Sequence, residues 1–161
     1  MKRISVLIAV LIIIALPVTA RAHCQVPCGI YNDVMRIMML EEHITTIEKA
    51  MNQITELSSA GDKNYNQIVR WVTNKDDHVD QFMDIVYNYF MAQRIKITES
   101  SATAAYDKYH RQLELLHQMT VYAMKCKQTT DLANVEKLKQ LVDDFAEAYL
   151  SADDLKHFHE H

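Results

Sequence analysis

The sequence predicts an all-α protein, built as an up-down-up-down four-helix bundle, on the basis of three observations. Glycine and proline each occur only twice in the 161 residues, so the residues that end helices and form hairpin turns are scarce. Apolar residues recur at alternating steps of three and four over long stretches, a spacing that places them on one helix face. The segments between these stretches are short, and short connections make neighbouring helices antiparallel.

The first predicted helix covers about residues 32–58. Its apolar stripe consists of Ile37, Leu40, Ile44, Ile47, Met51 and Ile54. The segment that follows is Ser58-Ser59-Ala60-Gly61-Asp62, in which Gly61 is typical of a helix end and Asp62 of the start of the next helix. We therefore expect a turn at this point.

The second predicted helix carries one charged residue in an otherwise apolar stripe. The stripe consists of Tyr65, Ile68, Val72, Lys75, Val79, Phe82, Val86 and Tyr89. A lone ammonium group in an apolar seam is unfavourable unless it is paired or reaches solvent. Two interpretations of Lys75 stay open: its side chain extends to bulk solvent, or it provides local positive potential at a functional opening.

The third predicted helix begins near Ser100 or Ser101, and the fourth follows Thr130-Asp131. The third stripe is Ala105, Tyr109, Leu113, Leu116 and Ala123, and the fourth is Val135, Leu138, Val142, Phe145 and Tyr149. The bundle then covers about residues 32–151 and leaves a polar, His-rich tail at 152–161. We expect this tail to be a disordered end that binds divalent metals only adventitiously.

The first 22 residues predict a secretory signal peptide. Lys2 and Arg3 precede an apolar run of about 13 residues, and Ala20-Arg21-Ala22 is a small-residue cleavage pattern. The run is shorter than the roughly 20 residues of a membrane-spanning helix. We expect cleavage between Ala22 and His23, and an exported, periplasmic or extracellular protein of one domain, 23–161, with no membrane anchor after cleavage.

The charge of the mature chain excludes one class of partner. Without Lys2, Arg3 and Arg21, the 17 basic residues fall to 14 against 21 acidic ones, a net charge of −7. An acidic protein of this kind is not expected to bind nucleic acid. It also has no global attraction for an anionic substrate, so any such attraction must come from a local positive patch.

The segment that cleavage would expose is suited to metal binding. It reads His23-Cys24-Gln25-Val26-Pro27-Cys28-Gly29-Ile30-Tyr31. It offers a free amine, an imidazole and two thiolates, while Pro27 and Gly29 allow the backbone to fold back on itself. Such a mixed set of nitrogen and sulfur donors favours nickel or copper over magnesium or calcium. The fold class is thus an all-α bundle with an irregular amino-terminal metal-binding hook, residues 23–31.

The pattern His-Cys-x-x-Pro-Cys-Gly-x-Tyr at a mature amino terminus resembles the nickel hook of the nickel superoxide dismutases. In that family a helical bundle of similar length follows the hook. The resemblance implies one nickel ion per chain, held by the amine and backbone nitrogens of His23 and Cys24 and by the thiolates of Cys24 and Cys28. It also implies His23 imidazole as an axial ligand, Ni(II)/Ni(III) cycling with superoxide as substrate, and a homohexamer.

Two further roles follow from the same resemblance. Tyr31 would stand beside the open face of the metal, where it positions superoxide or water without binding the metal. A carboxylate of the first helix would orient the imidazole of His23, and in this sequence only Glu41 or Glu42 is available, of which we prefer Glu42. The alternatives are a half-buried aromatic for Tyr31 and ordinary exposed carboxylates for the glutamates.

Other interpretations of these residues remain open. Spacing alone favours a disulfide between Cys24 and Cys28, with Cys126 as a buried thiol. A nonenzymatic alternative is an exported nickel- or copper-binding protein without redox turnover, in which the tail collects metal or helps load nickel. Glu114-Leu115-Leu116-His117 has the Glu-x-x-His spacing of a di-iron carboxylate bundle, although such sites need a second copy.

Overall fold

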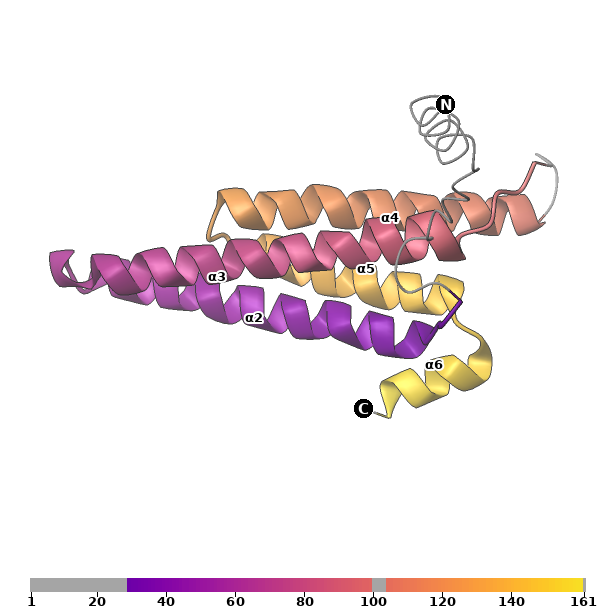
Figure 1. Ribbon diagram of the computed structural model, residues 1–161, viewed down its shortest axis with the longest axis horizontal. Helices are drawn as coiled ribbons and strands as arrows, with labels where there is room; N and C mark the ends of the chain where they lie inside the picture. Colours follow the sequence, from indigo (N-terminus) through magenta and orange to yellow (C-terminus); the bar gives the residue numbers. More distant parts are fainter. Residues whose placement is uncertain (1–28, 100–103, 161) are drawn as a thin grey trace, which may run out of the picture. The chain divides into compact units, whose positions relative to one another are not determined.

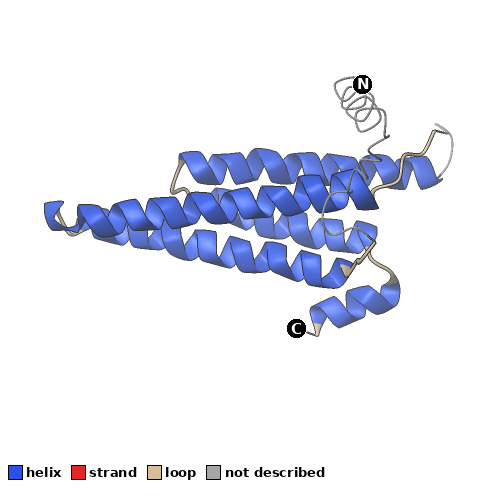
Figure 2. Cartoon of the chain, viewed as in Figure 1, coloured by secondary structure: helices blue, strands red, loops and turns tan. Residues whose placement is uncertain are grey.

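The computed structural model describes residues 29–99 and 104–160, apart from the side chain of Asp62. These residues form helices and short connections without a strand, which confirms the all-α prediction (Figures 1 and 2). The described residues from Tyr31 onward belong to one compact unit. Among the described residues we find no helix with the length and apolar character needed to cross a bilayer.

The predicted helices are present, with boundaries close to those expected. The elements are α2 (Asp33–Ser59), a 3-10 turn η1 (Asp62–Asn64), α3 (Tyr65–Asp84), a π-helix η2 (Ile85–Arg94), α4 (Ala104–Gln128), α5 (Ala133–Tyr149) and α6 (Ala152–His159). Gly61 joins α2 to η1 with a φ of 92°, a left-handed conformation that favours glycine. The predicted start of the third helix at Ser100 or Ser101 lies outside the described residues.

Side-chain contacts show that consecutive long helices are antiparallel. Asp33 at the start of α2 meets Tyr149 at the end of α5, and Lys75 of α3 meets Cys126 at the end of α4. Arg111 near the start of α4 pairs with Asp144 near the end of α5. The four helices therefore alternate in direction, as Figure 1 shows.

The burial of side chains confirms the predicted stripe of α2 in full and that of α5 except for its last residue. Every predicted residue of α2 is buried, and in α5 only Tyr149 is partly accessible. In α3, Tyr65 and Val72 are exposed, at 67% and 37%, contrary to expectation. The reason is that α4 ends beside Lys75, so the α2–α3 hairpin extends past the α4–α5 connection (Figure 1).

The predicted stripe of α4 is wrong at Ala105 and is confirmed in full only at Leu116 and Ala123. Ala105 is exposed, while Tyr109 and Leu113 lie at the edge of the core. The buried residues are Gln112, Leu115, Leu116, Met119, Ala123 and Cys126. Gln112 faces inward because its side-chain amide donates a hydrogen bond to the carbonyl of Ala148, at 3.0 Å. An apolar pattern cannot reveal a buried glutamine that is satisfied by a neighbouring helix.

The prediction of a disordered tail is also wrong, because residues 152–159 form α6. The Ser151 hydroxyl caps this helix by accepting a hydrogen bond from the backbone N–H of Asp154, at 3.2 Å. Phe158 is 5% exposed and Leu155 packs beside it against the core. These two residues, three apart on one helix face, give a polar segment enough apolar surface to dock.

Candidate metal centre

The described part of the predicted site begins at the end of the hook. His23, Cys24 and Cys28 lie outside the described residues. Gly29 has a φ of 74°, which favours glycine and agrees with the turn expected after Cys28. Tyr31 is described and is 42% exposed, so its side chain is accessible, whereas the alternative was a half-buried aromatic. Its role beside the metal stays a prediction.

Two side chains of η2 contact the ring of Tyr31. The guanidinium carbon of Arg94 lies over the ring, 4.2 Å from its centroid, a favourable cation–π distance. The ring of Tyr89 lies edge to face with it, at 5.9 Å between centroids and 72° between planes. Tyr31 is therefore held by a cation on its face and an aromatic ring at its side.

Asp33 joins these side chains to a third helix. Its Oδ1 accepts hydrogen bonds from the Tyr89 hydroxyl (2.6 Å) and from Arg94 Nε (2.9 Å). Its Oδ2 accepts from an Arg94 terminal nitrogen (2.6 Å) and from the Tyr149 hydroxyl (2.8 Å). The Arg94–Asp33 pair is thus bidentate, the strongest geometry for a charged hydrogen bond. We call Asp33, Tyr89, Arg94 and Tyr149 the Asp33 cluster.

The protonation states of the Asp33 cluster follow from these bonds. Burial alone would raise the pKa of Asp33, but the hydrogen bonds from Arg94, Tyr89 and Tyr149 outweigh it and lower that pKa below its usual value. Burial, with the Asp33 carboxylate as acceptor, raises the pKa of Tyr149 to about 12 and also raises that of Tyr89. At neutral pH the cluster is one carboxylate, one guanidinium and two neutral phenols that act as donors.

Local structure explains how distant residues meet here. The Asn32 side chain caps α2 by accepting a hydrogen bond from the N–H of Met35, at 3.0 Å, which places Asp33 in the first helical turn, where a negative charge is favoured. In η2 the hydrogen bonds run five residues back, as from Ile95 N to Phe90 O (2.9 Å). This π-helix brings Tyr89 and Arg94, five residues apart, to the same carboxylate.

Sequence reasoning missed Asp33 and Arg94 and treated Tyr89 and Tyr149 only as apolar stripe residues. One signal was present: both tyrosines end a predicted core stripe, and a buried tyrosine hydroxyl needs a hydrogen-bond partner. The acceptor lies 56 residues from Tyr89 and 116 from Tyr149. No periodicity reveals a contact over those separations.

The two candidate carboxylates lie over different surfaces of the bundle. Glu42 lines a cavity of about 590 Å³ between α2 and α6, and Asn32, next to Tyr31, lines it too. The other lining residues are Val34, Met35, Met38, Met39, Asp154 and His157. Glu41 instead lines a smaller cavity with Lys139 and Asp143. Burial, followed by repulsion from Asp143, raises the pKa of Glu41.

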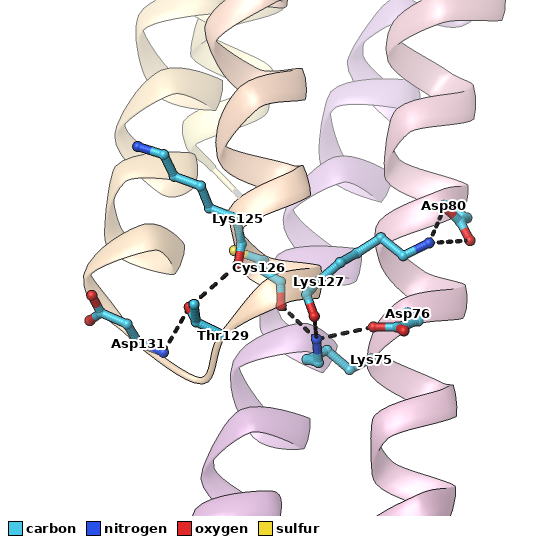
Figure 3. Close-up of polar contacts among 8 residues, drawn as sticks. All are labelled: Lys75, Asp76, Asp80, Lys125, Cys126, Lys127, Thr129 and Asp131. Atoms are coloured by element: carbon cyan, nitrogen blue, oxygen red, sulfur yellow. Dashed lines mark hydrogen bonds and ion pairs between the residues drawn. The ribbon is translucent and has the colours of Figure 1, made fainter.

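Lys75 is a structural residue, and both interpretations drawn from the sequence are wrong. Its side chain is 3% exposed. Figure 3 shows Nζ donating to the carbonyls of Cys126 and Lys127, each at 2.6 Å, and pairing with Asp76 at 3.0 Å. The ammonium thus satisfies carbonyls at the end of α4, where a positive charge is favoured. It neither extends to bulk solvent nor presents charge at an opening.

Cys126 lies in the core beside this contact. It is fully buried and is a free cysteine, as expected. Burial raises the pKa of its thiol to about 11, so the thiol is neutral and unreactive at physiological pH.

The di-iron alternative finds no support in the bundle. Glu114 and His117 are exposed on α4, whereas such sites project inward from facing helices. Within residues 29–99 and 104–160, no three His, Cys, Asp or Glu side chains form a group able to hold a metal ion. The donor set predicted for the hook, by contrast, has the nitrogen and thiolate chemistry that suits nickel.

Comparison with known proteins identifies the family. The family model of nickel-containing superoxide dismutase matches residues 18–153, about four fifths of the chain, including the hook and the whole of α2 to α5. Neither the curated proteins nor the solved structures gave a match. The chain therefore belongs to the nickel-containing superoxide dismutase family, and it is an oxidoreductase that uses nickel to act on superoxide.

Proposed function

We propose that the mature chain begins at His23 and holds one nickel ion in its hook. The ligands are the amine and imidazole of His23, the backbone nitrogen and thiolate of Cys24, and the thiolate of Cys28. When bound, nickel supplies the Ni(II)/Ni(III) couple by which one superoxide is oxidised to dioxygen and a second is reduced, with two protons, to hydrogen peroxide. The observation that carries this proposal is the family match across residues that include this donor set.

Tyr31 positions the substrate in this proposal. Its ring is held by Arg94 and Tyr89 while 42% of its surface remains exposed. A rigid but accessible phenol beside the hook is suited to orienting superoxide or an ordered water molecule. Tyr31 thereby restricts how the small substrate approaches and does not itself bind the metal.

The two protons for peroxide come from water or from groups of the hook. Tyr89 and Tyr149 are poor donors because their pKa values are raised and their protons are already bonded to Asp33. Arg94 keeps its proton because the bonds to Asp33 raise its pKa further. The Asp33 cluster therefore holds its protons during turnover and serves as a fixed support.

An acidic protein needs local positive potential to attract superoxide. Two arginines supply it here, and Lys75 does not. Arg94 lies on the face of Tyr31, and Arg36 lies 5.1 Å from the centroid of the Tyr89 ring. These two guanidinium groups concentrate positive charge beside Tyr31. Because Asp33 balances Arg94, the attraction for superoxide is local and modest.

Glu42 is our choice for the carboxylate that orients His23, because it shares a cavity with Asn32 while Glu41 lies toward α5. The chain is exported after cleavage at Ala22-His23, to the periplasm or the cell exterior, and assembles as a homohexamer. Export rests on the leader sequence, and the hexamer rests on the family relationship alone.

The test is to purify the protein from its native compartment and to determine its amino-terminal residue, nickel content and dismutase activity. We expect His23, about one nickel per chain, and activity that disappears in Cys24→Ser and in Cys28→Ser, because a hydroxyl cannot replace an electron-donating thiolate. Nickel binding without accelerated superoxide decay would indicate the nonenzymatic metal-binding alternative. Full activity in either serine variant would contradict the ligand set.

A further inference from the structure

The side chain of Arg94 makes two different contacts, one with Asp33 and one with Tyr31, and each uses a distinct property of guanidinium. Its edge donates two parallel hydrogen bonds to Asp33, at 2.9 and 2.6 Å. Its face covers the ring of Tyr31 at 4.2 Å. A planar, delocalised cation can do both at once, whereas a lysine ammonium has neither the fork nor the flat face.

The carboxylate of Asp33, which accepts both hydrogen bonds from Arg94, is itself held by two further donors. The Tyr89 hydroxyl from η2 and the Tyr149 hydroxyl from α5 each donate to Asp33, at 2.6 and 2.8 Å. Side-chain exposures of 21% for Asp33 and 25% for Arg94 place the pair partly out of water, where charged hydrogen bonds are stronger. The plane of the Arg94 guanidinium is therefore set by α2, η2 and α5 together.

We infer that Arg94 is a positioning residue for the dismutase reaction, which clamps the ring of Tyr31 against the Asp33 cluster. Tyr31 follows Cys28 by three residues, so the clamped ring is close along the chain to the last predicted ligand. The clamp fixes the phenol that orients substrate. The inference rests on the proposed function of Tyr31. As a positioning residue Arg94 acts through that side chain, separately from the positive charge that it contributes beside Tyr31.

The clamp depends on the π-helix. Tyr89 and Arg94 are the fifth and tenth residues of η2, and both donate to Asp33 Oδ1. Hydrogen bonding five residues back aligns side chains with that separation, whereas a regular α-helix would turn them apart. A π-helix placed beside a proposed active-site tyrosine thus has a specific geometric role.

The experiment compares the nickel-loaded protein with Arg94→Gln and Arg94→Lys, and uses Arg111→Gln as the matched control. Arg111 also pairs with two carboxylates, Glu114 and Asp144, but on the exposed surface of α4 and α5. Each protein carries 3-fluorotyrosine at position 31. The readouts are the ¹⁹F resonance of that label, nickel content, and the rate of superoxide decay at several salt concentrations.

We expect Arg94→Gln to narrow and shift the ¹⁹F signal toward that of a solvated tyrosine, and to lower the rate about tenfold or more at equal nickel content. Arg94→Lys should also shift the signal and recover the rate only in part, while Arg111→Gln should match wild type. An unchanged ¹⁹F signal in both Arg94 variants would overturn the clamp. A shifted signal with a wild-type rate would overturn its role in the reaction.

Three further outcomes bear on the clamp or on the proposed function. Full recovery of rate by Arg94→Lys would show that charge alone matters, and would overturn positioning. If the wild-type protein itself neither bound nickel nor accelerated superoxide decay, the proposed function would fail while the ¹⁹F comparison still reported on the clamp. If Arg94→Gln does not fold, Arg94→Lys gives the same comparison with the charge retained.

Discussion

The Asp33 cluster and the Lys75 contact each hold a charge at a helix end, but Asp33 is partly exposed whereas Lys75 is buried. Asp33 lies in the first turn of α2, and Lys75 contacts the last carbonyls of α4. Each charge is satisfied by neighbouring elements and complements a helix dipole. Lys75 is shielded from solvent, with 3% of its side chain exposed. The Asp33 cluster, by contrast, contacts Tyr31, which is 42% exposed. The two contacts thus differ in whether the side chains around the charge leave an accessible surface.

The largest expected effect tests whether the hook end is the active end. We predict that a chain starting at Ala22 folds like a chain starting at His23 but loses nearly all dismutase activity. The predicted ligand is the free amine of His23, and a peptide bond at that nitrogen removes its basicity and blocks its approach. The two proteins are loaded with nickel and compared by circular dichroism and by superoxide decay. Equal rates would remove the terminal amine from the mechanism.

The second prediction concerns Lys75, which we expect to act on stability and not on catalysis. Lys75→Met should lower the free energy of unfolding by about 2–4 kcal/mol, because the carbonyls of Cys126 and Lys127 and the carboxylate of Asp76 lose their partner. The rate per bound nickel and its salt dependence should not change. Urea unfolding and superoxide decay measure the two quantities.

Lys127→Met is the matched control for Lys75→Met. Lys127 pairs with Asp80 at 2.8 Å but lies at the surface, where such pairs contribute less than about 1 kcal/mol. A change in salt dependence in Lys75→Met alone would restore the electrostatic role that the structure contradicts.

The contrast also shows what a sequence can and cannot predict. The stripes of α2 and α5 were predictable because apolar periodicity is a local property. The hook could be proposed because its donors lie within six residues, and it stays a prediction. The Asp33 cluster was not predictable, since its members lie at positions 33, 89, 94 and 149. The buried Gln112 depends on a contact between α4 and α5. Lys75 was correctly marked as unusual, but its acceptors are backbone carbonyls that no sequence pattern displays.

A third prediction concerns the acid sensitivity of the Asp33 cluster. The folded pKa of Asp33 is lowered, so its contribution to stability is present above the unfolded value of about 3.9 and is lost as pH falls through the folded value. Asp33→Asn should cost about 1–3 kcal/mol at pH 7, and the difference from wild type should shrink below about pH 4. Unfolding measured at pH 7, 5 and 3 tests this. A difference that is constant with pH would assign the cost to packing instead.

The smallest expected effect is a pH dependence of stability from the pair of His43 and His78, which belongs neither to the Asp33 cluster nor to the Lys75 contact. His43 of α2 is 7% exposed, and its Nδ1 lies 2.9 Å from Nδ1 of His78 in α3. At that distance one ring donates and the other accepts, which requires the accepting ring to be neutral. Burial, and then the charge of His78, lower the pKa of His43, while Glu42 acts in the opposite direction.

Because the folded pKa of His43 lies below the unfolded value of about 6.5, the unfolded chain binds more protons in that interval. Stability from the pair is then present above about pH 6.5 and declines as pH falls through the folded pKa. We expect wild type to lose about 1 kcal/mol between pH 7.5 and 5.5 through this pair, and His43→Leu to lose less over the same range. His117→Gln, at an exposed position of α4, should keep the wild-type slope. Identical slopes in wild type and His43→Leu would show that the pair does not titrate on unfolding.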